Sequence, residues 1–102
     1  MGAMADDANP AADVRRNDAA RRYELELDGR VAGFIDYREQ GDALCLVHTE
    51  VEPAYEGQGL AAKLARGALD DARASGRKVV PTCSYVARYI ERHPDYAELV
   101  TS

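Results

Sequence analysis

The sequence has no apolar run close to the roughly 20 residues that a membrane-spanning helix needs. Its N-terminus also lacks the apolar segment that a secretory signal peptide carries. From these two absences we expect a cytoplasmic protein. The length of 102 residues suits one ordinary small domain with a single hydrophobic core.

Cysteine and histidine are scarce. The two cysteines, Cys45 and Cys83, are too few for a disulfide scaffold, so in a reducing compartment we expect two free thiols. The two histidines, His48 and His93, are far apart in the sequence, and no cysteine–histidine group has the spacing of a zinc site. We therefore expect no bound metal.

Basic residues are in the minority. The 13 lysines and arginines stand against 18 aspartates and glutamates, which gives a formal net charge of −5. Nucleic-acid binding through phosphate contacts requires a basic surface, so the composition argues against it. An acidic surface instead favours a cationic partner, such as an amine.

The first 18 residues have no periodic apolar pattern and are rich in alanine and aspartate. They predict a disordered tail, followed by a single domain at residues 19–102. Residues 1–4 (MGAM), with a second methionine at Met4, are expected to be a cloning remnant before the native start.

Residues 21–51 predict three antiparallel strands. Apolar and polar residues alternate over residues 23–27 and again over 31–38, and Asp28-Gly29 between them is a hairpin signal. A second turn at residues 40–42 leads into ALCLVHTEV at residues 43–51. The first half of this segment is apolar at successive positions, as expected for a central strand covered on both faces.

The second half of the chain predicts a helix, a strand and a second helix. Apolar residues recur at helical spacing over residues 59–75, and residues 77–81 predict a strand parallel to the third one, because a helix carries the chain back. Ser84 is a good N-cap for a helix that Pro94 stops, and residues 95–102 are compatible with a short helical turn. The predicted fold class is α+β, in the order βββαβα, with one mixed sheet and helices packed on it.

Two glycines, Gly57 and Gly59, stand directly before the first predicted helix. A helix N-terminus leaves its first amides unpaired and carries about half a positive charge. Because glycine has no Cβ, a ligand can approach this backbone closely, so the pair is typical of an anion site, above all for phosphate. The alternative is a plain glycine-rich turn from strand to helix.

The place of this loop, between the third strand and the crossover helix, resembles the acyl-CoA site of the GNAT superfamily of N-acetyltransferases. The GNAT loop pattern is Gln/Arg-x-x-Gly-x-Gly/Ala. Residues 56–61 (EGQGLA) fit this pattern except at Glu56, where a carboxylate replaces the usual donor. Residues 84–87 (SYVA) fit a second GNAT motif with Ser for Asn, and Glu91 takes the place of a tyrosine that often protonates the departing CoA.

Within this superfamily the chain resembles the very short YjdJ-like group. The resemblance covers residues 23–97 and is carried by HTEV at residues 48–51 and PTCSYV at residues 81–86. It implies a GNAT domain trimmed to its acetyl-CoA core, without the elements that usually shape the acceptor pocket.

The resemblance implies acetyl-CoA as co-substrate and an amine as acceptor, in a protein or peptide or a polyamine. The backbones of Thr49 and Val51 are expected to pair with the pantetheine arm as another strand would. Arg88 is expected either to meet a CoA phosphate or to lie on a solvated helix face. The implied CoA-binding residues are Thr49, Val51, Gly57, Gln58, Gly59, Leu60, Ala61, Ser84 and Arg88.

Three residues are catalytic candidates. Cys83 precedes a predicted helix, whose N-terminus lowers a thiol pKa, and by resemblance it faces the acetyl thioester, either to accept the acetyl group or to replace the missing proton donor. His48 and Glu50 are two residues apart on one strand, so they share a face, and either can take a proton from the amine. The alternatives are a buried core thiol at Cys83, as expected for Cys45, and a plain hydrogen-bonded pair.

We therefore expect an acetyl-CoA-dependent N-acetyltransferase of unknown amine acceptor. Glu56, Glu91 and the missing acceptor-side elements leave two alternatives open. One is a CoA-binding or acyl-CoA-binding module with little turnover, and the other is a protein-interaction domain that retains only the fold.

Overall fold

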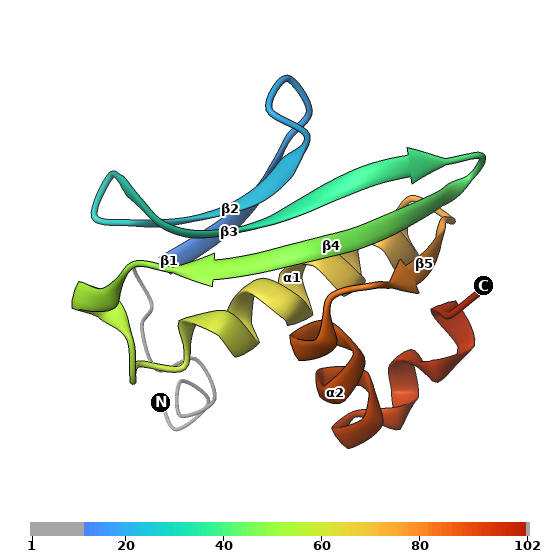
Figure 1. Cartoon of the computed structure of the whole chain (residues 1–102). Helices are drawn as coiled ribbons and strands as arrows, with labels where there is room; N and C mark the ends of the chain where they lie inside the picture. Colours follow the sequence, from blue (N-terminus) through green and yellow to red (C-terminus); the bar gives the residue numbers. More distant parts are fainter. Residues whose placement is uncertain (1–11, 102) are drawn as a thin grey trace.

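The computed structural model describes residues 12–101. In Figure 1 a five-stranded sheet lies above two helices, which pack on the same face of the sheet. In the described range no helix is long and apolar enough to cross a membrane. The elements are β1 (Ala12–Asn17), β2 (Arg22–Leu27), β3 (Arg30–Gln40), β4 (Ala43–Val51), α1 (Leu60–Ala74), β5 (Lys78–Pro81) and α2 (Ser84–Arg92), with short 3-10 turns at Pro53–Tyr55 and Pro94–Leu99.

The strands follow the chain order across the sheet, from β1 at one side to β5 at the other. Neighbours among the first four are antiparallel, whereas β4 and β5 are parallel because α1 carries the chain back along the sheet. Asp28 and Gly29 have φ values of 53° and 80°, the left-handed conformations that a tight two-residue hairpin requires. The α+β class and the parallel return of β5 are thus confirmed.

The predicted disordered tail is wrong for residues 12–17. These residues form β1, which pairs with β2 from end to end and makes the antiparallel part of the sheet four strands rather than three. Only two of the six residues, Ala12 and Val14, are apolar. Packing against α1, rather than intrinsic strand preference, therefore stabilises this strand. The rest of the predicted tail, residues 1–11, lies outside the described range.

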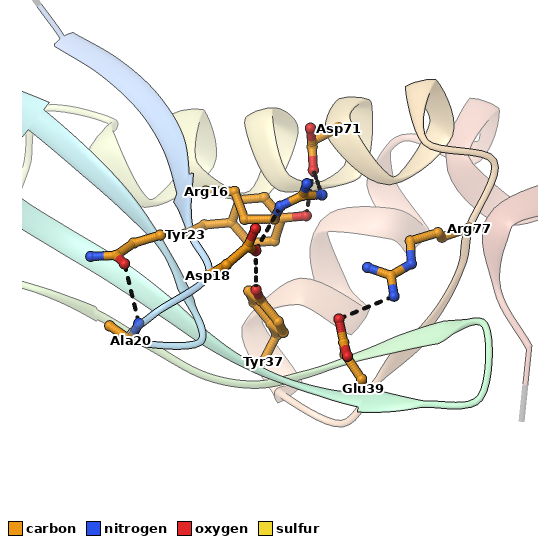
Figure 2. Close-up of polar contacts among 9 residues, drawn as sticks. Arg16, Asp18, Ala20, Tyr23, Tyr37, Glu39, Asp71 and Arg77 are labelled. Carbon is orange, nitrogen blue, oxygen red and sulfur yellow. Dashed lines mark hydrogen bonds and ion pairs between the residues drawn. The ribbon is translucent and has the colours of Figure 1, made fainter.

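A group of polar contacts fastens β1 to the rest of the fold (Figure 2). The Arg16 guanidinium lies 2.9 Å from carboxylate oxygens of both Asp18 and Asp71, the latter on α1. Asp71 also accepts a hydrogen bond from the Tyr23 hydroxyl (2.7 Å), and Asp18 accepts one from the Tyr37 hydroxyl (2.6 Å). Burial and the Asp18 carboxylate raise the pKa of Tyr37 to about 12, so its hydroxyl remains a donor at neutral pH. The charges of this segment thus attach it to β2, β3 and α1.

We expect Gly67→Ala to destabilise the protein, although alanine is favoured over glycine inside a helix by about 1 kcal/mol. Gly67 lies in α1, where an added Cβ would sit 2.8 Å from the Cβ and Cγ1 of Val14. Because β1 must then move off the helix, we expect a net loss of about 1–2 kcal/mol in the free energy of unfolding, measured by urea denaturation. A gain in stability would show that β1 does not pack closely on α1.

The core lies between the sheet and the two helices, on what we call the covered face of the sheet. Across the described residues the opposite, uncovered face has no helix on it (Figure 1). That face carries charged side chains at alternate positions, among them Arg22, Asp36 and Glu50. The largest fully buried side chains are Tyr23, Leu25, Ile35, Leu44, Leu46, Leu64, Leu69, Val79 and Val86.

Candidate functional site

Strands β4 and β5 separate partway along β4. Their pairing ends at Leu46 opposite Pro81, and the next backbone hydrogen bond runs from the Cys83 amide to the Leu46 carbonyl (2.8 Å). Beyond this point β4 continues to Val51, whereas the segment that follows β5 turns away into α2 (Figure 1). Over residues 47–51, the β4 edge that faces away from β3 therefore pairs with no other described strand. A free edge of this kind accepts an extended ligand as an additional strand.

A β-bulge in β4 decides which side chains face which side of the sheet at this point. Strand β3 pairs Tyr37 with Leu46 and Asp36 with His48, so Val47 has no partner. The extra residue shifts the alternation of side chains by one. Thr49 therefore points to the covered face with Val51, whereas His48 and Glu50 point to the uncovered face. The opposite orientation of the two pairs agrees with the sequence-based expectation.

Cys83 lies where the two strands separate. The helix begins at Ser84, so Cys83 is its N-cap residue, although its side chain makes no capping hydrogen bond. The sequence-based prediction that Ser84 is the N-cap is therefore wrong by one residue. Its sulfur is 3.3 Å from the Thr49 hydroxyl oxygen. The whole residue is 9% exposed. Burial raises the pKa of the Cys83 thiol, but the contact with Thr49 and the backbone amides at the start of α2 outweigh it, so the pKa is lowered overall.

His48 and Glu50 form a pair on the uncovered face. The distance from His48 Nε2 to Glu50 Oε1 is 3.0 Å, and both side chains are more than half exposed. The His48 ring also lies 6.2 Å, centroid to centroid, from that of Phe34. The structure thus brings two of the three catalytic candidates, His48 and Glu50, together. The third, Cys83, contacts Thr49 on the opposite, covered face of β4.

The glycine loop has the backbone that its sequence suggested. Gly57 and Gly59 have φ values of +88° and +74°, and Gly59 is the N-cap of α1. No side chain caps this end of the helix, so the first amides of α1 lack that partner. A Cβ added at either glycine would meet nothing within 4 Å, so the approach to the backbone is open.

A pocket of about 140 Å³ lies beside this loop and joins it to α2. Four of the five predicted loop residues line it, together with Val51 from β4 at the end of the free strand edge. Tyr55 and Ala62 were not predicted; Tyr55 belongs to a 3-10 turn that carries no recognisable motif. The lining residues are Val51, Tyr55, Glu56, Gly57, Gly59, Leu60, Ala61, Ala62 and Tyr85.

Four predicted CoA-binding residues lie outside this lining: Thr49, Gln58, Ser84 and Arg88. Thr49 is half-buried, and the other three are exposed. Ser84 and Arg88 are four residues apart at the start of α2, so they lie on one side of it near the pocket wall formed by Tyr85. Among the described residues no group of three or more His, Cys, Asp or Glu side chains is placed to hold a metal ion.

A comparison with protein families agrees with this geometry of a free strand edge, a glycine loop and an uncapped helix. A sequence model described as GCN5-related N-acetyl-transferase matches residues 22–99, from β2 to the final 3-10 turn. The chain belongs to this family. The family assignment therefore covers every element of the site described above.

Relatives in vertebrates support the assignment to the GCN5-related family. The protein NATD1 of Mus musculus is 43% identical over 83 residues, which covers 79% of this chain and 76% of the relative. The human NATD1 protein is also 43% identical over 83 residues, with coverage of 79% and 74%.

Solved structures share the fold. A GCN5-like protein from Staphylococcus aureus, solved by NMR, superposes with a TM-score of 0.67 at 19% identity and covers 91% of each chain. A GNAT family acetyltransferase from Brucella melitensis, in complex with acetyl-CoA, superposes with a TM-score of 0.54 at 25% identity, covering 71% of this chain and 54% of that one. The fold is thus that of a small GCN5-related N-acetyltransferase.

Proposed function

We propose that this protein is an acetyl-CoA-dependent N-acetyltransferase that acts on an amine. The observation that carries the proposal is the separation of β4 from β5 directly beside the glycine loop. The separation leaves one strand edge for the pantetheine arm and one helix N-terminus for the phosphates. Family membership and the acetyl-CoA complex of the Brucella relative support the choice of ligand.

The residues of the loop fit a phosphate group. Gly57 and Gly59 leave open space over their backbones, and the uncapped amides of α1 supply hydrogen-bond donors at the positive end of the helix dipole. Thr49 and Val51 then offer their outer backbone groups to the pantetheine arm. The acetyl thioester supplies the activated acyl group, and this arrangement carries it towards Cys83.

The reacting groups approach the edge of β4 from two sides. Cys83 meets the thioester from the covered face, where its sulfur contacts Thr49. The amine arrives from the uncovered face, where His48 takes its proton. With Glu50 ionised, its carboxylate accepts the Nε2–H of His48, which leaves the lone pair on Nδ1 free to act as the base.

We expect Glu56→Gln to strengthen acetyl-CoA binding. Glu56 lines the pocket beside the glycine loop, where its carboxylate repels a phosphate. Removing one such charge should lower the Kd about two- to fivefold, and the gain should shrink as salt is added. The control is Glu91→Gln, which removes an exposed carboxylate of α2 outside the pocket lining. Equal effects from both variants would contradict a phosphate site at the loop.

The test of turnover is CoA release in the presence of an amine panel. The full chain is mixed with acetyl-CoA and with lysine-containing peptides, N-terminal peptides or polyamines, and free CoA is followed by a thiol reagent. The proposal predicts amine-dependent release and an acetylated amine by mass spectrometry. If acetyl-CoA binds but no amine raises CoA release above the protein-free rate, the proposed reaction is contradicted.

A CoA-binding module with little turnover is the second candidate. Two observations favour it: Glu56 stands in the wall of the pocket, and the His48–Glu50 pair lies on the face opposite Cys83. This candidate predicts saturable CoA binding together with an unacetylated amine panel, so the same experiment separates the two functions.

A further inference from the structure

We propose that the acceptor is a small zwitterion, an ω-amino acid, whose carboxylate is held by Arg22 while its amine lies beside the His48–Glu50 pair. The identity of the reaction rests on the proposed function. The binding site is a property of the free protein, so it can be tested without acetyl-CoA.

The uncovered face of the sheet carries a second pocket, of about 360 Å³, which spans β2, β3 and the end of β4. These strands lie side by side in Figure 1. The volume suits a small molecule. Arg22 lines the pocket from β2, and Glu50 and Glu52 line it from the end of β4. A positive group thus faces two negative ones across the strand between them.

The Arg22 guanidinium is held in one orientation by the protein itself. Its Nε donates a hydrogen bond to Glu24 Oε2 (2.9 Å), and the Asn17 amide donates one to the same oxygen (3.1 Å). Its Cζ lies 4.5 Å from the centre of the Phe34 ring. With the described residues, the two terminal nitrogens make no hydrogen bond. A guanidinium fixed in this way is preorganised to bind a carboxylate through two hydrogen bonds.

Asp36 could compete with a ligand for Arg22, because it lies directly opposite Arg22 on β2 and His48 on β4. Within the described part of the chain it forms no ion pair with either residue. Arg22 pairs instead with Glu24, which is only 8% exposed and lies outside the pocket lining. The buried pair therefore uses one edge of the guanidinium and leaves the other for a ligand.

The other side of the pocket is acidic and adjoins the proposed base. Glu50 uses Oε1 for its contact with His48 Nε2 (3.0 Å), which leaves Oε2 for a ligand. The exposed Glu52 adds a second carboxylate. Together they attract an ammonium group, and an amine held there lies next to His48. The opposite edge of the same strand is the one proposed to hold the pantetheine arm.

The separation of the charges determines the kind of zwitterion. Strand β3 lies between Arg22 and Glu50, and adjacent strands are about 4.8 Å apart, so the two backbones are roughly 10 Å apart. An α-amino acid carries its amine and carboxylate on one carbon and reaches only one side. An ω-amino acid separates them by several methylene groups, which Phe34 and Val31 accommodate in the middle of the pocket. A polyamine would instead place a positive charge at Arg22.

The test compares three amines with the same five-carbon chain. δ-Aminovalerate ends in a carboxylate, pentylamine in a methyl group and cadaverine in a second amine. CoA release by the full chain is measured with each of them, and NMR titration measures their binding without acetyl-CoA. We expect kcat/KM to be roughly tenfold or more higher for δ-aminovalerate than for pentylamine, as for hydrogen bonds between charged groups, and lowest for cadaverine.

Variants of Arg22 assign this preference to the guanidinium. Arg22→Gln should lower kcat/KM and affinity for δ-aminovalerate roughly tenfold or more, and change the values for pentylamine by less than about twofold. Arg22→Lys, which keeps the charge but loses the planar fork, should lie between wild type and Arg22→Gln. The control is Arg38→Gln, which removes another exposed arginine of β3 outside the pocket lining. Thermal unfolding of each variant shows whether the fold is intact.

A preference for pentylamine or cadaverine would overturn the proposal, as would equal losses for all three amines in Arg22→Gln. The NMR titration separates this result from the proposed function. If δ-aminovalerate binds through Arg22 but no amine is acetylated, the acetyltransferase fails and the zwitterion site stands. If δ-aminovalerate does not bind, the site fails, whether or not acetyl-CoA binds and other amines are acetylated.

Discussion

Cys83→Ala is expected to lower amine-dependent CoA release by about a hundredfold or more, while acetyl-CoA affinity stays within about twofold of wild type. The loss follows because the sulfur proposed to meet the acetyl thioester is gone. The affinity is preserved because the proposed binding contacts are made by the free edge of β4 and by the glycine loop. Release is measured by steady-state kinetics and affinity by calorimetry.

Cys45→Ala is the matched control, since it removes an equally buried thiol, one that donates a hydrogen bond to Gln40. We expect some loss of stability but unchanged turnover. If Cys83→Ala turns over like wild type, Cys83 is a core thiol and the acetyl group passes directly to the amine. If both variants lose turnover equally, the effect belongs to packing rather than to chemistry.

Gly59→Ala is expected to weaken acetyl-CoA binding by about tenfold or more and to destabilise the fold by about 1–2 kcal/mol. At a φ of +74° an L-residue is strained, so the N-cap of α1 rearranges and the first amides of the helix lose their common direction. Because a Cβ at this position meets only open space, the effect arises from the backbone and from the obstructed approach of the ligand.

Gly41→Ala is a close control for this variant. Gly41 also has a positive φ, +60°, and an added Cβ there also meets nothing within 4 Å, but it lies in the turn before β4, at the end of that strand away from the pocket. We expect a similar loss of stability without a change in acetyl-CoA affinity. Equal losses of affinity in the two variants would mean that the glycine loop does not hold the phosphates.

Much of the fold was readable because local signals agreed with the final arrangement. The Asp28-Gly29 hairpin, the alternation in β2 and β3, and the helical spacing of α1 each determine an element from neighbouring residues alone. Strand β1 was not readable in this way. Its place in the sheet depends on the close packing of Val14 against Gly67, 53 positions later, and on the ion pair between Arg16 and Asp71.

The candidate site was predicted in its parts rather than in its arrangement. The sequence placed Cys83 before a helix N-terminus and grouped His48 with Glu50, and both statements match the structure. It gave no sign of the bulge at Val47, since a bulge depends on the register with β3. The contact between Thr49 and Cys83 follows from that bulge and from the end of β5, so only the folded chain reveals it.

The central claim is that acetyl-CoA binds between the free edge of β4 and the glycine loop. Calorimetric titration of the full chain with acetyl-CoA, with CoA as the comparison and with Gly59→Ala and Gly41→Ala alongside, tests it most directly. The account predicts saturable one-site binding in the micromolar range that Gly59→Ala weakens and Gly41→Ala does not. No heat and no thermal stabilisation of the wild-type protein at millimolar acetyl-CoA would contradict it.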